Sequence, residues 1–240
     1  MRLAIISDIH SNLPAFEAVL KAIAEHHVDS IVCLGDTIGY GPFPNECVEL
    51  VRTSCAICVK GNHDSGALGE TPLTDFNQYG QAAIRWTVDK LLDEHRSYLA
   101  QAPLLTLYEN LTIVHASPDS PGEWKYVHTM QSAEESFSAF TTDICFIGHT
   151  HVPVIIGEDL SINSFRPPRN GTLPANRFII NVGSVGQPRD GNPMAAFGLL
   201  DTSAWSYELV RTEYDIDITA SAITKAGLPR ILAQRLYQGV

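Results

Sequence analysis

The sequence predicts an α/β fold with functional side chains gathered at the carboxyl ends of its strands. In the first half of the chain, short apolar runs rich in Ile and Val alternate with segments of helical periodicity, which is typical of parallel strands covered by helices. Each apolar run also ends at a polar cluster, and ligands of such folds bind outside the carboxyl ends of the strands. A chain of 240 residues, 45% of them hydrophobic, can bury a substantial core, and we expect one domain over residues 1–240.

The elements that form this alternation are short. Buried strands are expected at 3–7, 30–34, 56–60 and 143–147. Helices are expected at 14–26, 43–51 and 76–99. Pro14 suits the first turn of its helix, and Ser11 or Asn12 can cap that helix.

After Pro103 the pattern changes, and a second, mixed sheet is expected. Its strands are assigned to 104–108, 111–115, 152–156, 177–181, 195–201 and 205–211. One helix is expected near 131–139, and two terminal helices within 215–237 that separate at Gly227-Leu228-Pro229. The segment 157–176, which carries Arg166 and Arg169, is expected to form an exposed hairpin or a long loop.

Composition disfavours several classes of protein. The formal net charge is −11 and Lys and Arg form no block, so binding to polymeric nucleic acid is not expected. No apolar run is long enough to span a bilayer and no signal peptide is recognisable, so we expect no membrane partner and a cytoplasmic protein. The five cysteines are an odd number, and the Cys55-Ala-Ile-Cys58 pair is interpreted as ordinary packing.

Polar side chains of one chemical kind follow the strands. Asp8 and His10 follow the first strand, Asp36 the second, Asn62 the third, and His149 and His151 follow 143–147, while His115 ends 111–115. Glycine precedes the polar residue at three of these ends, where the backbone must turn sharply. Imidazole, carboxylate and amide ligands suit first-row divalent cations.

The number of candidate ligands predicts two cations. Seven ligands exceed the three or four that a single catalytic zinc takes, but they suit two ions that share a bridging carboxylate. Two divalent ions, Asp8, Asp36 and a bridging hydroxide leave a net charge of about +1, so an acidic protein could hold a phosphate there. Such a pair lowers the pKa of its water and stabilises displacement at phosphorus.

These blocks resemble the calcineurin-like metallophosphoesterases, whose pattern is D-x-H, GD, GNH[DE], a lone H and then GHTH. The resemblance covers residues 3–190 and is closest to the small bacterial phosphodiesterase branch, to judge by the segment Asn181–Asp190. It implies a four-layer αββα sandwich of two mixed sheets flanked by helices, the metallo-dependent phosphatase fold. It also implies that one metal takes Asp8, His10, Asp36 and His151, and that the other takes Asp36, Asn62, His115 and His149.

The resemblance also implies roles for residues near the metals. His63 would bind the phosphoryl group or protonate the leaving oxygen. Asp64 either orients the His63 ring or caps the following helix, and both alternatives stay open. Where protein phosphatases of this superfamily read GD-x-x-D-R-G, this chain reads Gly35-Asp36-Thr37-Ile38-Gly39-Tyr40-Gly41, so their phosphate-binding arginine is absent. Arg189 is the candidate replacement, against an ordinary surface ion pair.

The function expected from the sequence is hydrolysis of a small phosphodiester or phosphomonoester by a hydroxide that bridges two metals. Mn, Fe, Ni and Zn are all possible, and the resemblance favours Mn. The alternatives are a dinucleoside-polyphosphate or Ser/Thr protein phosphatase, which the missing arginine disfavours, and a non-catalytic scaffold, which the complete ligand set disfavours. Oligomeric state cannot be read from the sequence.

Two segments could cover the cleft. Residues 65–74 could form a cover or a simple connector, and we favour the connector. Residues 124–128, within the stretch 117–130, could stack on a substrate ring or pack against the second sheet, and we favour packing. The remaining histidines lie outside the motifs and are interpreted as structural: His26, His27, His95 and His128.

Overall fold

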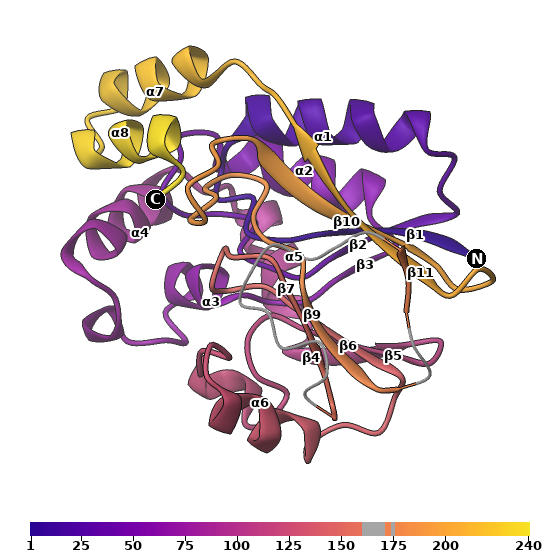
Figure 1. Ribbon diagram of the computed structural model, residues 1–240. Coiled ribbons are helices and arrows are strands. Elements are labelled where there is room, and N and C mark those ends of the chain that lie inside the picture. Colours follow the sequence, from indigo (N-terminus) through magenta and orange to yellow (C-terminus); the bar gives the residue numbers. More distant parts are fainter. Residues whose placement is uncertain (160–170, 174–175) are drawn as a thin grey trace.

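Two mixed β-sheets stacked on one another form the centre of the molecule (Figure 1). The computed structural model describes residues 1–159, 171–173 and 176–240. Within these residues, the first sheet has the strand order β3-β2-β1-β10-β11-β8 and the second has the order β4-β5-β6-β9-β7. Strands β1, β2 and β3 are parallel, as are β5, β6 and β9.

The strand bounds agree with the sequence except at the ends and at one short strand. The first sheet contains β1 (Arg2–Ile6), β2 (Ser30–Cys33), β3 (Ile57–Cys58), β8 (Gly171–Thr172), β10 (Ala195–Asp201) and β11 (Ser206–Thr212). The second contains β4 (Leu105–Tyr108), β5 (Leu111–Val114), β6 (Ile144–Ile147), β7 (Val154–Gly157) and β9 (Phe178–Asn181). The short β3 lies at the edge of its sheet.

Helices cover the outer faces of both sheets. They are α1 (Leu13–Glu25), α2 (Pro44–Ser54), α3 (Asn62–Leu68), α4 (Gln78–Lys90), α5 (Asp93–Gln101), α6 (Met130–Phe137), α7 (Ile216–Lys225) and α8 (Arg230–Gln238). Figure 1 shows α1 and α2 on one side of the sheets and α6 on the other. Short 3₁₀ turns occur at Leu73–Asp75 and Pro121–Glu123.

Alternation along β1 explains the layering. Leu3 and Ile5 point between the sheets and pack with side chains such as Phe146 of β6. Ala4 and Ile6 point the other way and pack under α1 against residues such as Phe16. A separate apolar cluster joins the outer face of the second sheet to α6. Because each sheet is apolar on both faces, each must be covered twice, and the αββα sandwich follows.

The structure corrects three expectations. The segments 195–201 and 205–211 form β10 and β11 of the first sheet, not the second, because β10 pairs with the free side of the buried strand β1. The expected helix at 76–99 is two helices, since Asn45 binds the Leu92 N–H and the Lys90 carbonyl at the break. Helix α3, which begins at Asn62, was not expected as a helix.

The segment 157–176 can be described only in part. Gly171 and Thr172 form β8, which pairs with the start of β11. Residues 160–170 and 174–175, and with them Arg166 and Arg169, lie outside the described residues. The two terminal helices are present, with the expected break between Lys225 and Arg230. The five cysteines are free thiols.

Candidate metal centre

The loops that leave β1, β2, β5 and β6, together with the start of α3, bring the seven candidate ligands together. Parallel strands end at the same edge, so loops far apart in sequence meet there. Each of these side chains is buried, and none has more than 9% of its surface exposed. They are Asp8, His10, Asp36, Asn62, His115, His149 and His151.

The backbone at this edge adopts a conformation that side chains usually avoid. Asp8, His10 and Asp36 have φ angles of 54°, 49° and 51°. His149 and His151 have φ angles of 65° and 59°. Left-handed backbone is unfavourable for residues with a Cβ, and such strain persists only where the surrounding structure enforces it. The loops are therefore shaped to present these side chains at a cost in local stability.

Two glycines make the close approach possible. A Cβ on Gly61 would lie 2.1 Å from Asp36 Oδ1, and one on Gly148 would lie 2.0 Å from Ser7 Oγ. Both contacts are far shorter than real Cβ contacts. Glycine is therefore required before Asn62 and His149, because any larger residue would displace the loops that carry Asp36 and Asp8.

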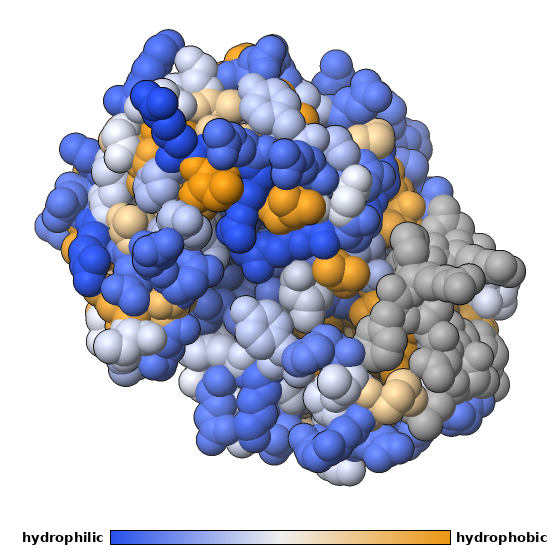
Figure 2. Space-filling model, turned by 60° about the vertical axis from the view of Figure 1, so that its left-hand side comes forward, coloured by the Kyte–Doolittle hydropathy of each residue, from blue (hydrophilic) through white to orange (hydrophobic). Residues whose placement is uncertain are grey.

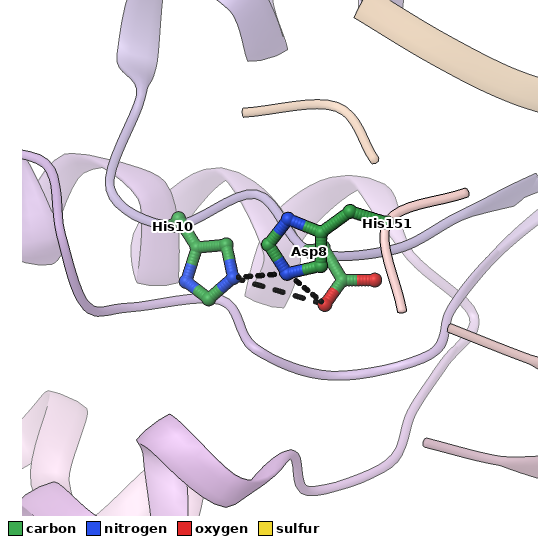
Figure 3. A group of neighbouring side chains, drawn as sticks. All are labelled: Asp8, His10 and His151. Carbon is green, nitrogen blue, oxygen red and sulfur yellow. Dashed lines mark hydrogen bonds and ion pairs between the residues drawn. The ribbon is translucent and has the colours of Figure 1, made fainter. Parts of the chain in front are cut away.

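Carboxylates and imidazoles alternate within the cluster. Asp8 Oδ1 lies 3.2 Å from His151 Nε2, and these two residues face His10 (Figure 3). Asp36 Oδ2 lies 3.5 Å from His10 Nε2 and 3.4 Å from His115 Nε2. Asp36 is therefore placed between the two halves of the cluster.

Three imidazoles are oriented by backbone carbonyls. The Nδ1 atom of His10 lies 3.1 Å from the Ile38 carbonyl oxygen, and that of His115 lies 2.8 Å from the Leu34 carbonyl oxygen. His151 Nδ1 lies 2.6 Å from the Gln187 carbonyl oxygen. A carbonyl accepts only from a protonated Nδ1, so each ring turns its Nε2 atom toward the cluster, where a metal can bind it once any proton on Nε2 is lost.

The donor set fits divalent cations. Asp8 Oδ1 and His149 Nε2 are buried and have no hydrogen-bond partner among the described residues. An isolated buried polar atom is costly, and a bound cation would satisfy both. Three groups of side chains have donor atoms close enough to share an ion, namely Asp8, His10 and His151; His10, Asp36 and His63; and Asp36, His115 and His149.

The electrostatics also favour a cation. Burial lowers the pKa of His115, but the carboxylates of Asp36 and Asp8 outweigh it and raise the pKa to about 10. Burial raises the pKa of Asp8, yet the imidazoles of His151 and His115 hold it below its ordinary value. Burial and the charge of His115 lower the pKa of His149 to about 3. The two carboxylates thus attract positive charge, which a metal ion can supply in place of a proton.

Asp64 takes the capping role. Its carboxylate accepts hydrogen bonds from the Gly61 N–H at 3.0 Å and the Ile38 N–H at 3.1 Å, at the start of α3. Its hydrogen bonds go to backbone groups and none goes to His63, whose Nδ1 has no partner among the described residues. Of the two alternatives, the structure therefore favours the cap over the orientation of His63, because an acid at the third helical position reaches back to the helix N-terminus.

His63 lies against aromatic rings at the edge of the cluster. Its ring centroid is 4.4 Å from that of Tyr40 and 5.1 Å from that of Phe76. Burial and the nearby Arg189 charge lower the pKa of His63 to about 4. Its backbone N–H donates to Asp36 Oδ1 at 2.8 Å, which ties the position of this ring to the central carboxylate.

A cleft of about 230 Å³ opens over the cluster. Figure 2 brings forward the edge where the parallel strands end, and this mostly hydrophilic face is hollowed. The ligand candidates that line the cleft are Asp36, Asn62, His149 and His151, and His63 and Arg189 line it too. The sequence did not single out Tyr40 or Phe76, although the glycines on both sides of Tyr40 were a usable signal of a tight turn.

Both segments that could cover the cleft contribute to its wall. Thr71 and Asp75 line it, so the region after α3 is more than a connector. Trp124 and Tyr126 line it as well, and the Tyr126 ring stacks on His149 with 4.1 Å between centroids. Val127 packs against the second sheet, so the preferred packing role holds for that residue but not for its aromatic neighbours.

Comparison with known proteins identifies the family. The chain matches the calcineurin-like phosphoesterase superfamily domain over residues 1–204. The chain belongs to this superfamily. A metallophosphoesterase from Sphaerobacter thermophilus is 43% identical, and its crystal structure superposes with a TM-score of 0.89 over 100% of this chain and 99% of that one.

Two curated relatives are similar along most of their length. An uncharacterized protein of Methanocaldococcus jannaschii is 39% identical over 99% of this chain and 98% of its own. The phosphodiesterase YfcE of Escherichia coli is 28% identical over 86% of this chain and 90% of its own. This chain is therefore a metal-dependent phosphoesterase, a hydrolase that acts on phosphoric ester bonds. None of the described helices is both long and apolar enough to cross a membrane.

Proposed function

We propose that this phosphoesterase hydrolyses a small phosphodiester with two divalent cations held at the strand ends. One cation would take Asp8, His10, Asp36 and His151, and the other would take Asp36, Asn62, His115 and His149. The observation that supports this most strongly is the central place of the Asp36 carboxylate, within 3.5 Å of imidazoles from both groups. Manganese is the proposed native metal.

The cations would supply a nucleophile from water at neutral pH and neutralise charge that develops at phosphorus. The protein's own residues would orient the ester. His63 lies on the cleft wall, and its neutral ring, whose pKa is lowered to about 4, can donate a hydrogen bond to the departing oxygen. Arg189 lies on the same wall and can bind a phosphoryl oxygen.

The size of the cleft favours a compact substrate. A volume of about 230 Å³ is below that of most drug-sized ligand sites, which are roughly 300–1,000 Å³. The loop Gly39-Tyr40-Gly41 lacks the acid and arginine of the protein-phosphatase pattern. These two observations favour a small phosphodiester over a protein or a dinucleoside polyphosphate. A cytoplasmic location and the absence of nucleic-acid partners remain predictions.

The proposal is tested by hydrolysis of bis(p-nitrophenyl) phosphate by protein stripped of metal and reloaded with Mn, Fe, Ni or Zn. Activity should return with metal, with about two ions per chain by elemental analysis. Asp36→Asn should abolish activity and lower metal content, whereas His63→Ala should lower activity and keep the metal. His27→Ala, at an exposed histidine just after α1 that is not a candidate ligand, is the control. Full activity in metal-free protein would overturn the proposal.

A further inference from the structure

We propose that Tyr40 is a positioning residue that seats the Arg189 guanidinium beside the phosphoryl-binding end of the cleft. This inference rests on the proposed function, in which Arg189 binds a phosphoryl oxygen. Tyr40 stands where the protein-phosphatase pattern GD-x-x-D-R-G has its arginine. A ring at position 40 would thus support an arginine that comes from elsewhere in the chain.

Among the residues that the structure describes, no carboxylate forms an ion pair with Arg189, and the neighbouring Asp190 pairs with Arg211. Arg189 lies on the cleft wall, and its buried Nε atom has no hydrogen-bond partner among the described residues. One terminal nitrogen donates to Gln187 Oε1 at 2.9 Å. An arginine so placed, with a free donor, is suited to a phosphoryl oxygen.

The Tyr40 ring supplies the surface on which Arg189 rests. The guanidinium carbon Cζ of Arg189 lies 5.7 Å from the centre of this ring. A guanidinium over the face of an aromatic ring is attracted by the negative face of that ring. The ring also contacts His63 and His10, with centroids 4.4 Å and 4.7 Å away. Tyr40 therefore contacts Arg189, the candidate phosphate-binding residue, together with His63 and the candidate metal ligand His10.

Tyr40 is itself held firmly. It is 6% exposed and packs in an apolar cluster with side chains of α4, α7 and α8, among them Ala83, Ile223 and Leu232. Its φ angle is 52°, and the next residue, Gly41, donates its N–H to the His10 carbonyl at 3.0 Å. Packing of the ring and the backbone hydrogen bond next to it hold Tyr40 in one position. The ring can therefore restrict where the long Arg189 side chain places its guanidinium.

The decisive experiment changes the electrostatics of the ring and preserves its size. Tyr40 is replaced by Phe and then by phenylalanine analogues with increasing numbers of ring fluorines. The fluorines weaken the negative electrostatic potential of the ring face step by step. The affinity of the manganese-loaded protein for inorganic phosphate is measured by calorimetry. Because Tyr40→Phe also removes the hydroxyl that hydrogen-bonds Arg189, the fluorinated rings are compared with Tyr40→Phe, and the most fluorinated ring should weaken the affinity roughly fivefold relative to it. Metal content and unfolding temperature should stay unchanged.

Two further series decide the assignment. In an Arg189→Ala background the fluorine series at position 40 should be flat, because the cation is gone. The same series at Phe16, a buried ring on α1, should leave phosphate affinity unchanged. The role of Tyr40 would be overturned if phosphate affinity did not change with fluorine content in the protein that retains Arg189. It would also be overturned if the affinity changed equally in the Arg189→Ala protein. If Arg189→Ala alone leaves phosphate affinity unchanged, Arg189 does not bind a phosphoryl oxygen, and that part of the proposed function is wrong instead.

Discussion

The floor and the wall of the cleft are built in different ways. The floor consists of the seven candidate ligands, which are buried and strained at five positions, and three of their imidazoles are oriented by backbone carbonyls. The outer wall consists of side chains from 3₁₀ turns and connecting loops, such as Tyr126, which is 48% exposed. The two sheets hold the floor residues in place, whereas wall residues such as Tyr126 pack on floor residues such as His149.

This difference assigns metal binding and catalysis to the floor and selection of the substrate to the wall. Groups that bind metals must be held within a fraction of an ångström, and the strained loops achieve this at a cost in stability. Loop side chains on a wall can change without disturbing the sheets, so one metal centre can act on different esters. Substitutions in the floor should therefore have large effects on every substrate, and substitutions in the wall should have small and selective ones.

The largest effect is expected from the floor, in Gly61→Ala. The new methyl group would lie 2.1 Å from Asp36 Oδ1 and would displace the central carboxylate. Hydrolysis should fall roughly 100-fold for every ester, with loss of bound metal, the scale of disturbed metal-site support. Gly122→Ala is the matched control, because Gly122, like Gly61, does not have left-handed backbone and its new methyl group would meet Leu104 at an ordinary 3.5 Å. Comparable metal loss in both variants would show that the contact with Asp36 does not explain the result.

A second effect concerns protons in the floor. The pKa of His115 is raised to about 10 in the metal-free protein because Asp36 and Asp8 outweigh burial, so this ring carries a proton at pH 7. Metal binding must displace that proton, and apparent metal affinity should therefore weaken as the pH falls. Calorimetry in buffers of different ionisation enthalpy should show proton release on binding. An identical heat in all buffers would contradict this.

The same shift predicts how metal-free protein responds to pH. A histidine whose pKa is raised from 6.5 to about 10 by folding stabilises the folded state fully below pH 6.5. That stabilisation is lost as the pH rises toward 10. The unfolding temperature of chelator-treated protein should fall over this range, and the fall should be smaller in His115→Gln. A fall of equal size in both proteins would assign it to other groups.

The sequence predicted the floor but not the wall, and the reason is physical. Each floor residue follows a strand, and a strand with a polar end is a local signal that one sequence carries. The wall depends on contacts between distant segments, as where the Trp124 indole N–H donates to Thr71 Oγ1 at 3.0 Å. The role of Asp64 stayed open for the same reason, because helix α3, which it caps, was not recognised.

The smallest effect is expected from the wall, in Tyr126→Ala. This ring stacks on His149 and also lines the cleft, so its loss should change kcat/KM for bis(p-nitrophenyl) phosphate only about threefold. The change should be smaller for methyl p-nitrophenyl phosphate, which has one ring fewer. Leu107→Ala, an exposed apolar residue on β4 that is 63% exposed, is the control.

Metal content decides how a larger effect of Tyr126→Ala would be interpreted. If activity on both esters falls about 100-fold and metal is lost, the stacked ring holds His149 in place and belongs to the floor. If the ratio of the two activities shifts and metal is retained, the ring acts on the substrate. The division between floor and wall requires the second result, because a wall residue can alter which ester is bound without altering the centre that cleaves it.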